Sequence, residues 1–383
     1  MTRARDTADL LALAPTAQAT EPVETLPLII NGTFRIKQRM DAETVRDGLN
    51  IDISGNHTHD RWKLDINSIG AVDTTTDSEV PSGQGFKTSI KIRCRTADGS
   101  PAAADRLAWG QIIEDQNCII TRKGHSDAKK LTVAFWVRSY LTGTYILELY
   151  DFQNSRQISQ AYTISSANTW EKKVLVFPGD TTGQFANDTG QGLMCNWWLA
   201  AGSNYSSGTL STTWTSDTTA NRAVGQVNFQ GTSGANSFYL TGVQLEVGEY
   251  TATTIPPFRH LTYGEELIRC MRYLEIVAGG DDQLIGLGGM YSGSHFDCTL
   301  NTIVEKRATP TMIVKDASNH FKIRVDNESK TGDTIDTIGG RSHYLKQHLQ
   351  INSGHIPAGI SQGFNGLLAT NNAAGFLKLM AEL

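Results

Sequence analysis

The chain has 383 residues, a formal net charge of −5 at pH 7, 39% hydrophobic and 19% charged residues. This length allows two or three domains that each bury a core, so the fold need not depend on disulfides or metals. A mildly acidic chain without a basic stripe is not expected to bind nucleic acid, and no apolar stretch approaches the roughly 20 residues of a membrane span.

Residues 1–27 are rich in Ala, Thr, Pro and Glu and contain one short amphipathic patch around Leu10, Leu11 and Leu13. Such a segment is expected to be poorly ordered by itself, or to be a peptide that docks on a larger assembly and orders there. Its short apolar run follows two aspartates and does not resemble a signal peptide, so synthesis in the cytoplasm is expected.

Residues 28–250 repeatedly show the period-two alternation of half-buried strands. Leu131, Val133, Phe135 and Val137, for example, fall on one face of a predicted strand. Polar stretches rich in Gly, Ser, Thr, Asn and Asp separate the strands and favour turns. We therefore predict an antiparallel jelly-roll sandwich, in a chain of mainly β structure.

Residues 251–276 form a Thr/Pro connector and the one clear helix. Apolar residues recur with helical period from Leu267 to Leu274, and Thr262 and Glu265 have capping-box spacing, which predicts a helix over 263–276. Residues 277–383 predict a small C-terminal β domain of short strands. This domain has few large apolar residues, so we expect partner chains to complete its core.

The five cysteines are odd in number and lack C-x-x-C pairs or the spacing of a zinc site, so we predict buried, small apolar side chains and no bound metal. They are Cys94, Cys118, Cys195, Cys270 and Cys298.

Three stretches, 168–183, 196–203 and 240–248, resemble tail-fibre and related virion proteins of tailed phages that carry a carbohydrate-binding-module-like jelly roll. The segments 257–275 and 307–312 look like the junction of such proteins and their C-terminal tip. The resemblance implies a homotrimeric virion appendage, such as a short tail fibre. It would attach to other virion proteins through residues 1–27 and expose its C-terminal domain to the host surface.

The sequence contains neither a Walker A motif nor H-E-x-x-H. Ser292 and His295 lack the glycines and helix of a nucleophile elbow. His57 and His59 share one face of an extended segment and would suit zinc or nickel, but no third ligand is identifiable, so we interpret them as solvated loop residues.

A glycosidase would need two carboxylates about 5 to 9 Å apart across a cleft. The pairs Glu148 with Asp151 and Glu114 with Asp115 are candidates, and we interpret both as surface carboxylates in salt bridges.

Sugar binding is the more credible chemistry, because aromatic rings offer flat apolar faces to a pyranose. Trp197 and Trp198 are neighbours on a predicted strand, so at least one is expected to point outward. Tyr205 and Trp214 lie in a Ser/Thr/Gly-rich region without an obvious core to fill. These four residues are the predicted ligand-binding residues.

Related jelly rolls often hold a structural calcium ion between their first and last strands. Asn31 suits such a site, but Gly242 stands where the resemblance implies an acidic side chain. We therefore predict no cofactor.

The sequence favours a non-enzymatic structural and receptor-binding component of a virion that binds host surface glycan. The alternatives are a virion-associated polysaccharide depolymerase and a capsid decoration protein.

Overall fold

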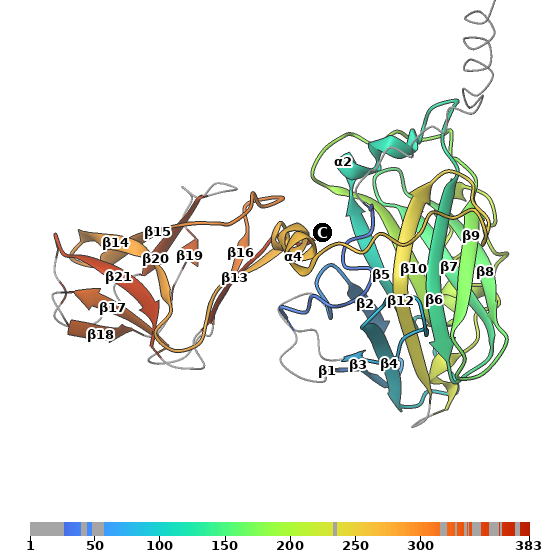
Figure 1. Cartoon of the computed structure of the whole chain (residues 1–383), viewed down its shortest axis with the longest axis horizontal. Helices are drawn as coiled ribbons and strands as arrows, with labels where there is room; N and C mark the ends of the chain where they lie inside the picture. The colour runs from blue at the N-terminus through green and yellow to red at the C-terminus, as the bar shows by residue number, and fades with distance from the viewer. Residues whose placement is uncertain are drawn as a thin grey trace, which may run out of the picture.

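The computed structural model describes residues 27–39, 44–47, 57–232, 236–314, 320–325, 328–332, 335, 337–338, 346–351, 360, 362–371 and 376–383. Apart from Pro27, the predictions for residues 1–27 lie outside this set. The described strands pair antiparallel in four sheets and the helices are few and short, so the predicted mainly β fold class is confirmed. Figure 1 shows two lobes, with helix α4 (Tyr263–Met271) between them.

The larger lobe is a sandwich of two six-stranded sheets. The first has the order β1 (Thr44–Asp47), β3 (Ala71–Asp77), β4 (Ser89–Thr96), β12 (Ser237–Val247), β6 (Leu131–Ser139) and β9 (Glu171–Phe177). The second has the order β11 (Thr215–Ser216), β8 (Arg156–Ile164), β7 (Gly143–Asp151), β10 (Gln191–Ala201), β5 (Arg106–Glu114) and β2 (Lys63–Asn67). Short helical turns lie in its loops: α2 (Asp115–Cys118), η1 (Ile119–Thr121), α3 (Ser203–Ser206), η2 (Thr219–Asn221) and η3 (Phe229–Gly231).

The alternating apolar residues of these strands meet between the two sheets and form the main core. On β6, the residues predicted to share a face are all buried in it. Trp62 and Trp109 stack at its centre with ring centroids 4.4 Å apart, and Phe34 packs against both rings at 4.9 Å. Such large aromatic side chains each bury much apolar area, so the jelly roll has a large apolar core of its own.

The smaller lobe holds a three-stranded and a seven-stranded sheet. The three-stranded sheet has the order β13 (Leu274–Gly279), β22 (Phe376–Met380) and β16 (Thr311–Val314). The seven-stranded sheet has the order β18 (Glu328–Gly332), β17 (Phe321–Val325), β21 (Asn365–Thr370), β14 (Leu284–Ser292), β15 (His295–Asn301), β20 (Lys346–Ile351) and β19 (Thr337–Ile338). Among the described residues, the core of this lobe consists of aliphatic side chains together with Met290, Phe296, Cys298 and Phe321.

Helix α4 begins where the sequence predicts. The Thr262 hydroxyl accepts from the Glu265 amide, and the Glu265 carboxylate accepts from the Thr262 amide, which makes a complete capping box. The predicted end at 276 is wrong, because Leu274 and its successors form β13. There they pair with β22 at the end of the chain, and this long-range pairing overrides the helical period.

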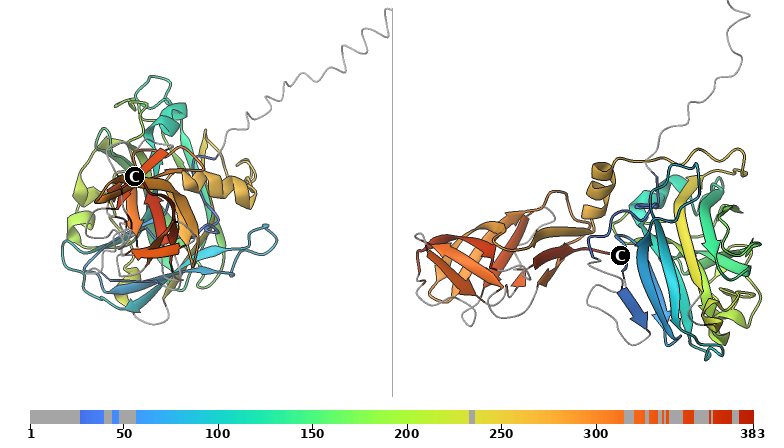
Figure 2. Two further views of the ribbon diagram at one scale, coloured as in Figure 1. Left: turned by 90° about the vertical axis from the view of Figure 1, so that its left-hand side faces the viewer. Right: turned by 60° about the horizontal axis from the view of Figure 1, so that its bottom comes forward.

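The junction between the lobes is built from buried charges. Figure 2 shows that the C-terminus returns to this junction, and Figure 1 shows the same. Glu382 places its carboxylate on Arg39 at 2.8 Å and also on Arg61, while His57 lies 3.6 Å away. Burial alone raises the pKa of Glu382, but these cations outweigh it and lower the pKa to about 2.

All five cysteines are free and buried, as predicted. Burial raises the pKa of Cys195 to about 12, as expected for an inert thiol. Within the described residues, no helix is long and apolar enough to span a bilayer.

Candidate functional site

Trp197 and Trp198 point to opposite sides of β10, as neighbours in a strand must. Trp197 belongs to the core between the sheets, and Trp198 lies on the outer face of the second sheet beside Ala108 and Ile146. Their exposed fractions are 0% and 1%. The prediction that one of them stacks on a ligand is therefore wrong, because loop residues after β10 cover the outer face.

A buried ion pair holds this covering loop on the sheet. Arg222 of the loop donates two hydrogen bonds to Glu148 of β7, at 2.6 and 2.9 Å, and Trp198 Nε1 donates to the same carboxylate at 3.0 Å. Burial opposes the charge of Arg222, but the attraction of Glu148 outweighs this and raises the pKa of the guanidinium. Glu148 thus fixes the loop on the sheet and accepts all three of these hydrogen bonds.

Tyr205 emerges from this cover at the edge of a shallow, open hollow. The hollow lies between α3 and η2 and is lined by Ser203, Asn204, Tyr205, Ser207, Thr219 and Ala220. The Tyr205 ring is half-buried and rests on Trp198, with ring centroids 5.3 Å apart. Its other neighbour is Arg106 of β5, which donates to the Tyr205 hydroxyl at 2.9 Å.

Arg106 is itself held by Asp65, which accepts from its Nε at 2.8 Å. Tyr205 is therefore fixed by a ring below it and by a charged hydrogen-bond donor at its hydroxyl. Apart from Ala220, the other residues that line the hollow have hydroxyl or amide side chains. An aromatic ring among several hydroxyl and amide groups suits a saccharide, whose C–H faces contact the ring while its hydroxyls form hydrogen bonds.

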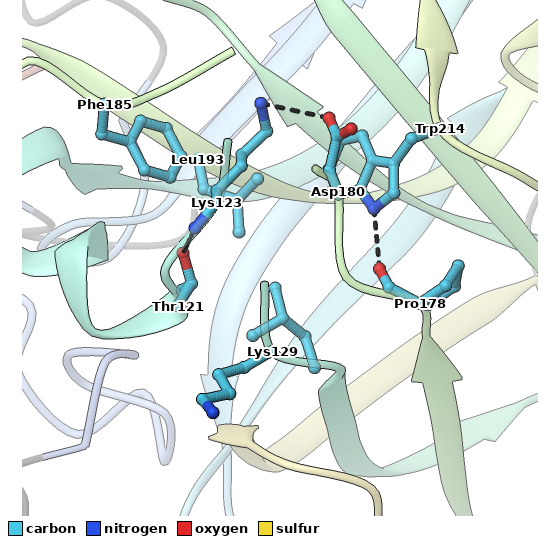
Figure 3. Close-up of a pocket in the computed structure, with 9 residues that line it drawn as sticks. Thr121, Lys123, Lys129, Pro178, Asp180, Phe185, Leu193 and Trp214 are labelled. Atoms are coloured by element: carbon cyan, nitrogen blue, oxygen red, sulfur yellow. Dashed lines mark hydrogen bonds and ion pairs between the residues drawn. The ribbon is translucent and has the colours of Figure 1, made fainter. Parts of the chain in front are cut away.

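Trp214 lies in a different pocket, which Figure 3 shows. Its ring is half-buried against the main core, and its Nε1 donates to the Pro178 carbonyl at 2.8 Å. Lys123, Asp180 and Phe185 also line this pocket. The two pockets share no lining residue, so the structure does not bring Tyr205 and Trp214 into one site.

The other carboxylates that the sequence suggested for a glycosidase also form ion pairs or hydrogen bonds within the protein. Glu114 accepts two hydrogen bonds from Arg272 at 2.9 and 2.7 Å and a third from the Tyr273 hydroxyl at 2.8 Å. Asp151 pairs with Lys123 at 2.5 Å. Salt bridges are thus present as predicted, but the expected surface location is wrong: Glu114, Glu148 and Asp151 are all fully buried.

Asp115 is buried beside Glu114 and forms no salt bridge that the structure records. Its Oδ1 accepts from the Asp188 amide at 3.1 Å, and burial raises its pKa.

His57 and His59 are buried, which contradicts the prediction of solvated loop residues. Ring nitrogen Nε2 of His59 shares a 2.8 Å hydrogen bond with the Thr76 hydroxyl, and burial lowers the pKa of His59 to about 3. Within the described ranges, no three His, Cys, Asp or Glu side chains are grouped to hold a metal ion. Ser292 and His295 lie at the β14 and β15 hairpin and hydrogen-bond to each other at 3.2 Å.

Asn31 and Gly242 do not fit a calcium site. Asn31 lies in a turn before the first strand, and its Oδ1 already accepts from the Ile36 amide at 3.0 Å. A side chain at Gly242 would collide with the Phe86 ring, 2.4 Å from an added Cβ. An acidic side chain therefore does not fit at position 242, and Asn31 Oδ1 already accepts a hydrogen bond from the backbone.

Comparison with known proteins gives no family model and no curated protein that matches this chain. Solved structures with low similarity include a putative sugar binding protein from Bacteroides thetaiotaomicron, at 13% identity and a TM-score of 0.30, which covers 58% of this chain and 100% of that chain. Another, described as "CBM4 structure and function", has 12% identity and a TM-score of 0.28 and covers 57% and 97%.

A third is the enzymatically active domain of tailspike protein 4 from bacteriophage CBA120, at 16% identity and a TM-score of 0.28. That match covers 49% of this chain and 19% of the tailspike chain. At these identities and TM-scores the likeness carries no argument about function, which therefore rests on the site itself.

The candidate site includes Tyr205, which the sequence predicted as a ligand-binding residue, and Arg106, Asn204 and Thr219, which it did not. Arg106 and Tyr205 are 99 positions apart and meet only because β5 pairs with β10. Asn204 and Thr219 are small polar residues in a loop full of such residues, so no local signal distinguishes them.

Proposed function

We propose that this chain is a structural and receptor-binding component of a phage virion, a short tail fibre or similar appendage, that binds host surface glycan without catalysis. The observation that carries the glycan part is the half-buried Tyr205 ring, fixed by Trp198 and Arg106 in an open hollow of hydroxyl and amide groups. The virion part rests on the resemblance of residues 168–275 to tail-fibre proteins.

The buried ion pairs of the candidate carboxylates support glycan binding rather than glycan hydrolysis. Glu114, Glu148 and Asp151 are fully buried, and each pairs with a cation that holds the carboxylate in place. A glycosidase needs one carboxyl group that keeps its proton and a second that faces the sugar. None of these three residues is exposed to a hollow that a sugar could enter.

The test measures binding of the purified protein to polysaccharide from a candidate host surface. We expect Tyr205→Ala to weaken binding about tenfold or more, because it removes the stacking surface; a tenfold loss corresponds to about 1.4 kcal/mol. Asn204→Ala should weaken it less. Tyr263→Ala is the matched control, since Tyr263 is an exposed tyrosine outside the hollow.

Equal binding by all three variants would refute the hollow as the glycan site. Release of new reducing ends from the polysaccharide would instead favour the depolymerase alternative.

We further propose that the chain assembles as a homotrimer, attached to the virion through residues 1–27. The smaller lobe supports the assembly. Strand β14, in the middle of the seven-stranded sheet, exposes Leu284, Leu287 and Tyr291 by 58%, 68% and 68%. Large apolar side chains grouped on one strand are typical of a surface that another chain covers. The covering chain in this proposal is another copy of the same protein.

A further inference from the structure

Lys123 is a buried lysine whose ammonium group is surrounded by oxygen atoms. Its Nζ lies 2.5 Å from Asp151 Oδ2 and 3.1 Å from Asp180 Oδ2, and it donates to the carbonyls of Thr182 and Gly183, both at 2.9 Å. The side chain is 5% exposed. The four oxygens come from the end of β7 and from the loop between β9 and β10, so one cation joins two separate segments.

The four oxygens around Lys123 Nζ form a cage. Its two carboxylates, from Asp151 and Asp180, are also held in place by groups other than the lysine. Asp151 accepts from the Gln153 amide at 2.9 Å and from the Asn154 amide at 3.1 Å and side chain at 2.9 Å. Asp180 accepts from Arg156 at 2.6 and 2.9 Å and from the Thr182 amide at 3.1 Å.

The turn that presents the two carbonyls requires glycine. Gly183 has a φ of +74°, and a Cβ there would lie 2.6 Å from the Asn154 side chain. The carbonyls of Thr182 and Gly183 therefore occupy positions set by the backbone, and the cage as a whole is fixed by groups other than Lys123.

The donor set is the kind that a hard metal cation takes. Calcium in proteins is held by Asp carboxylates, backbone carbonyls and water, and an ammonium group has only three protons for the four oxygens present here. The lysine brings one positive charge to two buried carboxylates, and Arg156 brings the second. The local charge is therefore balanced without any metal.

Two aromatic rings close the remaining sides. The Trp214 and Phe185 ring centroids lie 5.6 and 5.5 Å from Lys123 Nζ. Figure 3 shows the lysine between these rings and pointing to Asp180. A cation at this position thus also fixes Trp214 at the rim of the jelly roll.

We propose that this cage is a cation site and that the Lys123 ammonium occupies it permanently in place of a metal ion. The jelly roll is thereby independent of calcium, and removal of the lysine side chain converts the cage into a calcium site that water completes. The proposal does not depend on the glycan-binding function.

The test compares the full-length wild-type protein with Lys123→Ala, using terbium as a calcium analogue whose emission Trp214 sensitises at short range. Wild-type protein should show no sensitised emission and the same melting temperature in calcium and in EDTA. Lys123→Ala should melt at a lower temperature in EDTA, recover part of the loss in calcium, and show terbium emission that excess calcium removes.

Lys129→Ala is the matched control, because Lys129 lines the same pocket but has no recorded contact with the four oxygens; it should behave as wild type. Lys123→Ala with Asp151→Asn should lose the terbium signal. A folded Lys123→Ala protein that binds neither terbium nor calcium would overturn the proposal. So would a wild-type protein whose melting temperature falls in EDTA, a measurement that does not require any variant to fold.

The short contact with Asp151 also defines a covalent alternative, in which the amine and the carboxyl group condense to an amide and release one water. An intact mass lower than the sequence by one water, absent in Lys123→Ala, would overturn the resident-cation proposal.

Discussion

The two lobes bury apolar surface in different ways. All seven tryptophans of the chain lie in the jelly roll, where Trp62, Trp109, Trp197 and Trp198 are fully buried. The smaller lobe has no tryptophan and leaves three large apolar side chains of β14 exposed. We therefore expect the jelly roll to be stable by itself and the smaller lobe to depend on contacts outside its own core.

Those outside contacts are of two kinds. One is the charged junction, where Glu382, at the end of the chain, inserts into the jelly roll. The other, in our proposal, is the neighbouring copies that cover β14.

The largest effect should come from Glu382→Ala. It leaves the buried guanidiniums of Arg39 and Arg61 without their carboxylate, and loss of one partner of a buried ion pair costs about 3–5 kcal/mol. We expect the smaller lobe to unfold or detach at lower denaturant concentration while the jelly roll holds. Tryptophan fluorescence follows the jelly roll alone, and circular dichroism follows both lobes.

The control is Glu249→Ala, which removes an exposed pair with Lys130 and should change little. Coincident unfolding of both lobes in Glu382→Ala would contradict the proposed difference in their stability.

The second effect concerns pH and should appear in the jelly roll. The pKa of His59 falls to about 3 because of burial, so the unfolded chain binds a proton at a higher pH than the folded chain. Stability from neutral His59 is therefore present above about pH 6.5 and is lost as the pH falls toward 3. Asp60 acts in the opposite sense, since burial raises its pKa to about 6.

His59→Gln isolates the histidine contribution, and its side chain retains a group that can bond Thr76. Relative to wild type, the variant should gain about 1.4 kcal/mol for each pH unit below 6.5. Urea unfolding between pH 6.5 and 4.5 measures this difference. The exposed His125 provides the control His125→Gln, which should follow wild type; a parallel pH dependence in His59→Gln would show that burial does not keep His59 neutral.

Leu287→Asp should have the smallest effect on the fold of a single chain. It should have the clearest effect on assembly. The new charge would lie within the proposed contact between copies, and charges in the core of an interface are disfavoured. Light scattering should show a trimer for the wild type and a smaller species for the variant.

Ile303→Asp is the control, because Ile303 is equally exposed at 68% but lies outside β14. A trimer that survives Leu287→Asp would place the contact elsewhere, whereas a wild-type monomer would refute the trimer itself.

The sequence by itself determined the strands and the start of α4. Alternation with period two selects strands because successive side chains point to opposite faces, and the capping box at Thr262 and Glu265 is a local hydrogen-bond pattern. The buried cysteines and the location of Tyr205 in a polar loop also followed from residue type and spacing.

Only the tertiary structure decided where α4 ends, which tryptophan faces are covered, and which carboxylates are paired. Leu274 joins β13 because β22 arrives from the end of the chain, and Trp198 is buried because Arg222 bonds Glu148 across 74 positions. Lys123 reaches two aspartates and two carbonyls that lie 28 to 60 positions away in the sequence. Local patterns encode the direction of a side chain, but its burial and charge partners depend on segments far away in the sequence.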